Sequence, residues 1–397
     1  MKPIFFFGTL RDPVLLALVI GRPLAETEAP EARADGWAPY TVAGEAYPML
    51  KPAPGEVATG RLFTPRTQDE VEAILYYEEA EYALTPITVT TAAGAVDGYG
   101  EGAVEAAFFD ATTKLRPGTQ VWSFEDWWAR DRAVALEAAA ELMPLRASLP
   151  VERIDDVWPG IMNRARQRAR AAASTPALGG IRQDFDAARD VVWELHERPY
   201  NGYLAVERHI LRHRLFDGGM SAPVDRLTVG WGDAVTVLPY DPVTDQVLLI
   251  EQFRPAPAAR RDPNPWCIEV PAGRIDADED AETAIRREAA EEANVTLGRL
   301  LALPGYYPTP GLGSEHLGAW IGEADLAHYA GGTFGEPGEG EDIRAFALPF
   351  SAALEALRAG AVNTGPAQIL LLWLAVERDR LRAAWAAAPA AQAAPQA

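Results

Sequence analysis

The sequence predicts a mixed protein with α+β and α/β parts, and three observations lead to that prediction. The chain has 397 residues, enough for two or three domains of roughly 150 residues each. The first 125 residues contain short apolar runs separated by Gly and Pro, a pattern typical of a β-rich domain. From residue 191 to residue 385, apolar strand-like runs alternate with helical patterns, which is typical of an α/β domain.

The N-terminal domain, residues 1–125, is expected to form a mixed sheet or a small barrel. One helix interrupts its strands at residues 67–82, and Thr67 is a suitable N-cap because a Thr hydroxyl can accept the hydrogen bond of a free helical N–H. The strands are expected at residues 3–10, 39–50, 57–63, 84–92 and 102–111.

Residues 126–190 are rich in Ala, Arg and Glu and are expected to form a helical linker, with helices at 123–145 and 150–174. The basic stretch from Arg164 to Arg170 has two interpretations, a nucleic-acid patch or a solvated helix face. The stretch is short, so the solvated face is the prediction.

The C-terminal domain, residues 191–385, should begin with long strands and end with helices. The low-complexity tail 386–397 is expected to be disordered. Strands are expected at 203–215, 226–240, 245–253, 267–272, 299–307, 316–324 and 343–350, and helices at 281–293, 351–360 and 365–385.

Charge and cysteine content exclude several classes of protein. The 36 basic and 57 acidic residues give a formal net charge of −21, which disfavours nucleic acid and anionic membranes as partners. The only cysteine, Cys267, excludes an internal disulfide framework, and no apolar stretch is long enough to span a bilayer. The N-terminal apolar run is interpreted as a strand, since a signal peptide needs a longer apolar core. A cytoplasmic location is the expectation.

The segment from Gly273 to Val295 carries the strongest chemical signal. Its helix presents Glu288, Glu291 and Glu292 at spacings of three and four, which places the three carboxylates on one face. Like charges this close repel each other and need compensation. Carboxylate oxygens are the ligands that a hard divalent cation such as Mg²⁺ prefers.

A solvated acidic helix face is the simpler explanation of that segment, but the complete spacing argues against it. The order is Gly273, five residues, Glu279, seven residues, Arg287-Glu288, then Glu291-Glu292 and finally Asn294-Val295. This pattern resembles the Nudix box at nearly every fixed position. The departures are Ala289, where a larger aliphatic residue is usual, and Asn294, where the box has Gly. Asn tolerates a left-handed helix end and can serve as a C-cap.

The resemblance implies a Nudix α/β/α sandwich that hydrolyses a nucleoside diphosphate linked to another group. It implies Mg²⁺, with Mn²⁺ as an alternative, bound by Glu288, Glu291, Glu292 and the carbonyl of Ala272. Arg287 stands one turn before Glu291 and could orient it.

The flanks of the box are similar to the ADP-ribose pyrophosphatase subgroup. The strand from Trp266 to Gly273 fits W-x-x-E-x-P-A-G, and Pro310 lies fifteen residues past Val295. The segment EGEDIR at 339–344 resembles a mobile loop of the subgroup. The resemblance implies substrate contacts from Arg254, Gly273 and Pro310. It also implies that Glu339 and Glu341 act in catalysis, one as general base and the other, for which Glu341 is the candidate, at the metal.

Each flank also has a structural interpretation. Trp266 could be a core residue, Arg254 could form an ordinary ion pair, and the acids at 336–342 could form an exposed turn. Their occurrence together with the box favours function. Upstream, residues 199–221 resemble the subgroup's exchanged N-terminal strands, which implies a homodimer and an adenine pocket with Tyr203 stacked on the base and Arg226 nearby.

The start of the chain carries a second resemblance. Phe6-Phe7-Gly8-Thr9-Leu10-Arg11 resembles the Y-G-[ST]-L turn of γ-glutamylcyclotransferase-like (AIG2-like) proteins. The resemblance implies a mixed β-barrel in which Gly8, Thr9 and Leu10 hold a carboxylate and Glu78 acts as base. Phe7 replaces the usual Tyr, and Glu78 stands among other helix acids, so a binding module without catalysis is the alternative.

This domain order is similar to bacterial fusion proteins associated with tellurite resistance. The function expected is hydrolysis of ADP-ribose, or a related ADP-sugar, to AMP and ribose 5-phosphate. Three alternatives stay open: hydrolysis of another nucleoside diphosphate sugar, a non-catalytic ADP-ribose sensor, and a γ-glutamyl enzyme with a regulatory Nudix part.

Overall fold

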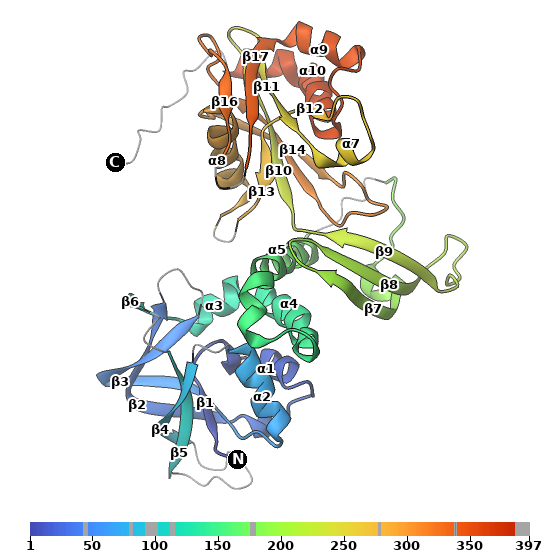
Figure 1. Ribbon diagram of the computed structural model, residues 1–397. Helices are drawn as coiled ribbons and strands as arrows, with labels where there is room; N and C mark the ends of the chain where they lie inside the picture. Colours follow the sequence, from blue (N-terminus) through green and yellow to red (C-terminus); the bar gives the residue numbers. More distant parts are fainter. Residues whose placement is uncertain are drawn as a thin grey trace. The chain divides into compact units, whose positions relative to one another are not determined.

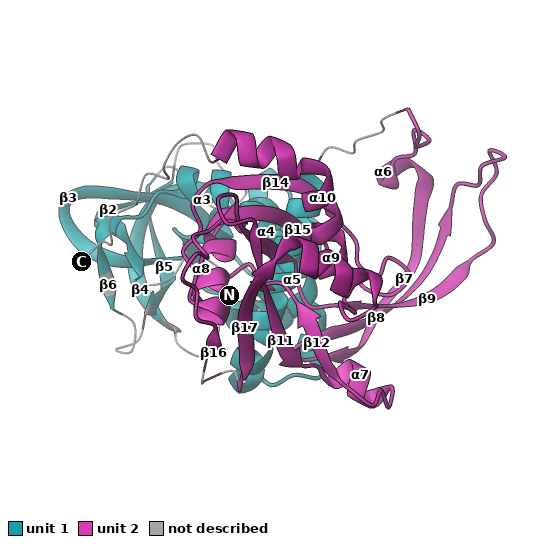
Figure 2. Ribbon diagram, turned by 90° about the horizontal axis from the view of Figure 1, so that it is seen from above, with its two compact units in different colours: residues 1–179 teal, residues 180–397 magenta. Residues whose placement is uncertain are grey.

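The computed structural model describes residues 1–42, 47–78, 82–91, 102–111, 116–174, 180–276, 279–336, 338 and 340–385. It divides into two compact units, residues 1–179 and 180–397 (Figure 2). The helices expected to link the domains belong to the first unit. The division falls at residue 180, whereas the sequence placed the start of the second domain at residue 191.

The first unit is built on a closed ring of strands (Figure 1). Strand β1 pairs with β3 and β5, β5 with β4, β4 with β2, and β2 with β3, while β6 extends the sheet beyond β2. Among the described strands of the first unit, only the β1–β5 pairing is parallel. The mixed barrel is therefore confirmed. The strands are β1 (Ile4–Phe6), β2 (Glu31–Val42), β3 (Pro48–Phe63), β4 (Tyr82–Thr91), β5 (Gly102–Ala111) and β6 (Pro117–Val121).

Strand β1 is buried on both faces, as its uninterrupted apolar sequence requires. Successive side chains point to opposite faces, so Phe5 packs in one core with Leu62, and Phe6 packs in another with Ile74. The hydroxyl of Thr67 accepts the N–H of Glu70, which confirms Thr67 as a helix N-cap. The helices of this unit are α1 (Pro13–Val19), α2 (Gln68–Tyr77), α3 (Phe124–Arg130), α4 (Arg132–Leu142) and α5 (Ile154–Ala173).

The prediction of a solvated basic face on α5 was wrong for Arg164. Its side chain is 1% exposed and pairs with the fully buried Glu141 of α4 at 2.6 Å. Arg168, one turn further, also reaches Glu141. These arginines lie between two packed helices because a buried carboxylate there neutralises them.

The second unit contains a large sheet and a separate three-stranded sheet of β7, β8 and β9. The order in the large sheet is β14-β15-β10-β11-β17-β16, with β12 on β11 and β13 on β10. The strands are β7 (Val191–Asn201), β8 (Ala205–His213), β9 (Val224–Gly230), β10 (Ala234–Asp241), β11 (Gln246–Phe253), β12 (Trp266–Glu269), β13 (Ala272–Arg274), β14 (Leu300–Tyr306), β15 (Leu317–Glu323), β16 (Gly332–Phe334) and β17 (Ile343–Pro349).

Helices cover both faces of the large sheet, which confirms the α/β/α sandwich (Figure 1). Alternating residues of β11 divide between the two cores: Leu248 packs with Ile285 of α8, and Leu249 packs with Leu370 of α10. The helices are α6 (Ala187–Asp190), α7 (Pro255–Ala259), α8 (Ala281–Ala293), α9 (Phe350–Arg358) and α10 (Gly365–Trp385).

One expected strand proved to be two. Residues 226–240 were predicted as a single strand, but β9 and β10 belong to different sheets. The chain turns between them at Gly232, whose φ of +115° is a conformation that favours glycine. Trp231, at this break, lines the cavity described below.

Every helix of the described residues is too short or too polar to cross a lipid bilayer. The predicted disordered tail, residues 386–397, lies outside the described part of the chain.

Candidate active site

Helix α8 is held at both ends by its own sequence. The side chain of Asp280 accepts the N–H of Thr283 at 2.8 Å as an N-cap. Asn294 ends the helix with φ +50° and ψ +43°, the left-handed cap predicted for it. Ala289 is fully buried in the core between α8 and the sheet, so the smaller residue in the box fits close helix–sheet packing.

Two carboxylates of α8 point back to the loop and strand before it. Glu292 is 2% exposed and accepts the backbone N–H of Ala272 at 2.8 Å. The Glu288 carboxylate lies against Gly273, where an added Cβ would fall 1.8 Å from Glu288 Oε1. A glycine at position 273 therefore leaves the space that this carboxylate occupies.

Arg287 organises the remaining acids of the box. Its guanidinium donates to Glu279 at 2.7 Å, and to both Glu288 and Glu291 at 2.8 Å. It also donates to the carbonyl of Arg274 at 3.1 Å. The contact with Glu291 confirms that Arg287 orients this residue. Glu279, near the start of the box, orients Arg287 in turn.

The electrostatics of the site fit a divalent cation. Burial raises the pKa of Glu288 to about 7, and the charges of Glu291 and Glu341 contribute to the shift. Burial also raises the pKa of Glu292 well above its usual range, with Glu288 and Glu341 contributing. Buried carboxylates that repel each other need a counter-charge, and their oxygens are the donors of a hard cation site.

A cavity of about 440 Å³ opens beside these carboxylates, a size typical of small-molecule sites. Arg254 stands at its wall and forms two hydrogen bonds with Glu269, at 3.0 and 2.7 Å. Tyr203 is 69% exposed, and the guanidinium of Arg274 lies 4.6 Å from its ring centroid. The cavity therefore combines an aromatic face, cationic groups and carboxylates. Its lining includes Tyr203, Trp231, Thr236, Arg254, Glu269, Ala272, Gly273, Arg274, Arg287, Glu288, Glu315 and Glu341.

The predicted site residues divide between the cavity and its surroundings. Six of the predicted residues line the cavity: Ala272, Gly273, Glu288, Arg254, Tyr203 and Glu341. Glu292 lies behind Ala272, and Glu291 pairs with Arg287. Glu339 lies outside the described residues.

Three further expectations have different outcomes. Pro310 stands in an exposed turn and Arg226 on β9, where it donates to the carbonyl of Asp225 at 2.8 Å. Neither is among the residues that line the cavity. Trp266 is 50% exposed, so its interpretation as a core residue was wrong.

Sequence reasoning missed several lining residues. Glu269 was part of a quoted motif, but its role in holding Arg254 was not inferred. Glu315 accepts the indole N–H of Trp231 at 2.8 Å, and burial raises the pKa of Glu315. Trp231 and Glu315 are 84 positions apart, so no local pattern could have paired them.

The N-terminal turn is well defined in the first unit. Gly8 is followed by a single 3-10 turn, Thr9–Arg11, in which the Arg11 N–H donates to the Gly8 carbonyl at 3.1 Å. Leu10 is 1% exposed and shares its core with Ile74 of α2. Glu78 is the half-buried C-cap residue of the same helix. One core thus supports both the turn and the helix that carries Glu78.

Comparison with known proteins agrees with both resemblances. Residues 230–365 match the family model described as NUDIX domain. A curated relative is 36% identical to this chain over 197 residues, and the match spans 93% of that relative's length. The chain belongs to the Nudix family of hydrolases. Nudix hydrolases generally need a divalent metal. Residues 4–127 match the model described as gamma-glutamyl cyclotransferase, AIG2-like.

The relatives differ in the substrate that their names print. The protein just mentioned is the ADP-ribose pyrophosphatase of Escherichia coli K12, and it matches 50% of this chain. The ADP-ribose pyrophosphatase of Haemophilus influenzae is 32% identical over 188 residues, 47% of this chain and 86% of its own length. The GDP-mannose pyrophosphatase of Enterobacter sp. is 36% identical over 148 residues, 36% of this chain and 74% of its own length.

Proposed function

We propose that the C-terminal unit hydrolyses the pyrophosphate bond of ADP-ribose, or a related ADP-sugar, and releases AMP and ribose 5-phosphate. The observation that carries the proposal is the cavity in which Glu288 and Glu341 share a lining with Arg254 and Tyr203. Acidic groups suit a metal-bound pyrophosphate, an Arg suits a phosphate, and an aromatic ring suits a nucleobase. The relatives named ADP-ribose pyrophosphatase support this substrate.

The metal we propose is Mg²⁺, with Mn²⁺ as an alternative. Glu288, Glu291, Glu292 and the carbonyl of Ala272 would hold it, together with Glu341. When bound, the cation polarises phosphate oxygens and activates a water molecule for attack on phosphorus. Arg287 would keep Glu288 and Glu291 oriented during turnover, because it donates to both.

The reaction breaks one bond between phosphorus and the bridging oxygen. Water adds its oxygen to one phosphorus, and the bridging oxygen leaves with the other phosphate. Of the two loop acids, one would accept the proton of the water and the other would assist at the metal; Glu341, which lines the cavity, is the candidate for the metal, which leaves Glu339 as the base. Arg254, held by Glu269, would bind a phosphate, while Tyr203 would stack on the adenine.

Two alternative activities predict different results in one experiment. A hydrolase for another nucleoside diphosphate sugar would prefer GDP-mannose over ADP-ribose in a panel that also contains ADP-glucose and NADH. A non-catalytic sensor would bind ADP-ribose and leave it intact. We expect ADP-ribose to give the highest kcat/KM in the panel, with AMP identified by chromatography.

For the N-terminal unit we propose γ-glutamyl chemistry or carboxylate binding at the turn of Gly8, Thr9 and Leu10. The support is the 3-10 turn beside a core shared with α2, the helix that ends at Glu78. A γ-glutamyl peptide assayed for 5-oxoproline tests it. Product that disappears in Glu78→Gln supports an enzyme, and peptide binding without product supports a binding module.

We also propose a cytoplasmic homodimer that forms through the C-terminal unit. The support is the three-stranded sheet, which leaves large apolar side chains exposed: Trp193 is 59%, Tyr200 is 56% and Leu227 is 52% exposed. Large apolar side chains exposed on one small sheet are typical of subunit contacts. Light scattering of the purified protein gives the mass that decides between monomer and dimer.

A further inference from the structure

Two histidines and a glutamate form a cluster on the three-stranded sheet. These residues come from a part of the chain that precedes helix α8 and its carboxylates. One potential ligand atom from each of His196, Glu207 and His209 lies within 4.8 Å of the other two. His196 of β7 stands directly opposite His209 of β8 in the strand register. Glu207 precedes His209 by two residues, so it shares the face of the sheet.

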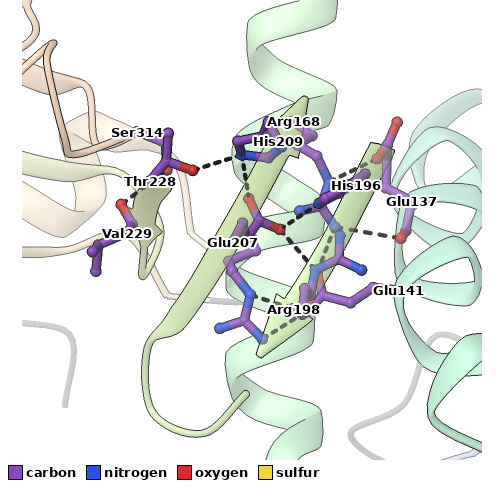
Figure 3. A network of polar contacts seen from close by, with 11 residues as sticks. Glu137, Glu141, Arg168, His196, Arg198, Glu207, His209, Thr228, Val229 and Ser314 are labelled. Atoms are coloured by element: carbon purple, nitrogen blue, oxygen red, sulfur yellow. Dashed lines mark hydrogen bonds and ion pairs between the residues drawn. The ribbon is translucent and has the colours of Figure 1, made fainter. Parts of the chain in front are cut away.

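The distances within the cluster are suitable for a shared ion. His196 Nε2 lies 3.2 Å from Glu207 Oε1, and His209 Nε2 lies 3.9 Å from Glu207 Oε2 (Figure 3). Ligand atoms bound to one tetrahedral Zn²⁺ at about 2.0–2.1 Å are separated by roughly 3.3 Å. The two distances therefore lie on either side of the separation that a bound ion requires, and small side-chain rotations would bring the atoms to it.

His209 is a buried histidine with an unused ring nitrogen. It is 7% exposed, and its Nδ1 has no hydrogen-bond partner among the described residues. Its Nε2 lies 2.8 Å from the hydroxyl of Thr228 on β9, which fixes the ring. The cation would bind His209 at Nε2, the nitrogen that lies 3.9 Å from Glu207 Oε2, in exchange for the contact with Thr228, and Nδ1 would carry the ring proton. His196 is 41% exposed at the side chain, so an ion can reach the cluster from solvent.

Arg198 binds the glutamate of this cluster. Its Nε donates to Glu207 Oε1 at 2.7 Å, whereas the other carboxylate oxygen faces His209. Carboxylates that bind metals are often hydrogen-bonded by a second group in this way. Arg198 would thus orient Glu207 and need not leave when an ion binds.

We propose that His196, Glu207 and His209 form a second metal site, which takes a divalent transition-metal ion of the zinc class. Two imidazoles and one carboxylate suit such an ion, whereas Mg²⁺ prefers oxygen ligands alone. A fourth position stays open for water. The ion would join β7 to β8 within the hairpin whose turn carries Tyr203, and so would tie together the two strands that present Tyr203 to the cavity.

The test titrates the full-length protein with Zn²⁺ against a chromophoric chelator, in saturating Mg²⁺ so that the α8 carboxylates are occupied. We expect one equivalent of bound Zn²⁺, and an affinity at least about tenfold lower in His196→Gln, Glu207→Gln and His209→Gln. His213→Gln is the matched control, because His213 is an exposed histidine on the same strand; it should bind Zn²⁺ like the unmodified protein.

A second control separates this site from the α8 site. The double variant Glu288→Gln/Glu292→Gln should keep its equivalent of Zn²⁺. Far-UV circular dichroism verifies the fold of each variant, and if His209→Gln does not fold, the exposed His196→Gln decides. The proposal is overturned if no equivalent of Zn²⁺ binds, or if binding is lost in the double variant and retained in all three cluster variants.

Discussion

The carboxylate of Glu288 lies so close to Gly273 that a Cβ at position 273 would fall 1.8 Å from Glu288 Oε1. Gly273→Ala should therefore displace this carboxylate, which is the flexible end of a side chain, and leave the backbone in place. We expect kcat for ADP-ribose to fall at least about tenfold, the lower range for disturbed metal-site residues, with a small change in thermal stability. Steady-state kinetics and a thermal melt measure the two effects.

Gly365→Ala is the control for that substitution. A Cβ at position 365 meets no atom within 4 Å, so this variant should retain normal turnover. If Gly273→Ala also retains normal turnover, the close approach of Glu288 to the strand has no role in catalysis.

Removal of a charge from α8 should lower the rate of catalysis and leave the fold intact. Glu288→Gln and Glu292→Gln each lose a candidate metal ligand, and we expect kcat to fall at least about 100-fold, since outer residues of metal sites alone cost 10–100-fold. The fold should persist, because both substitutions remove repulsion in the metal-free protein. Glu282→Gln on the same helix is the control, as the Glu282 side chain is 61% exposed and its carboxylate pairs with Arg286, away from the candidate metal ligands. Near-normal rates in Glu288→Gln and Glu292→Gln would contradict the metal assignment.

Loss of a loop acid, Glu339 or Glu341, should lower kcat more than it weakens substrate binding. Glu341→Gln, and likewise Glu339→Gln, should lower kcat by about 100-fold, the lower range for loss of a general base, with a smaller effect on KM. Glu336→Gln is the control, because Glu336 contacts Glu341 through its backbone N–H, at 3.1 Å. Unchanged kcat in both Glu341→Gln and Glu339→Gln would remove this loop from the mechanism.

The raised pKa of Glu288 predicts how stability depends on pH and metal. This pKa is about 7 in the folded protein and about 4.3 in an unfolded chain. Between these values the folded state binds more protons, so the metal-free protein should lose stability as pH rises from about 4.3 through 7. A cation that binds the ionised carboxylate then stabilises more at high pH.

The corresponding measurement is the shift in Tm on addition of Mg²⁺ at pH 6 and at pH 8. We expect the larger shift at pH 8, and a smaller difference between the two pH values in Glu288→Gln. An equal shift at both pH values would show that Glu288 does not couple protons to metal.

Local patterns predicted much of the site, and their success has a physical basis. The C-cap Asn294 and the spacing of Glu288 and Glu292 are properties of one helix, so local sequence was enough to predict their geometry. The pairing of Trp231 with Glu315 and of Arg254 with Glu269 depends on strand packing and could not be read from spacing.

Burial was the property that the sequence predicted least well. Arg164 belongs to a basic stretch that indicated a solvated face, yet it lies buried against Glu141. Its charge partner is 23 positions away, on another helix, and only tertiary packing brings the two together. Gly232 similarly divided one apolar run between two sheets.

The central claim is that the second unit cleaves ADP-ribose, and one measurement tests it most directly. The full-length protein is incubated with ADP-ribose and Mg²⁺, and AMP and ribose 5-phosphate are quantified over time, with and without a chelator. The account predicts that the two products appear in equal amounts and that the chelator stops them. ADP-ribose that is bound but remains intact in Mg²⁺ and in Mn²⁺ would contradict the account and identify a sensor instead.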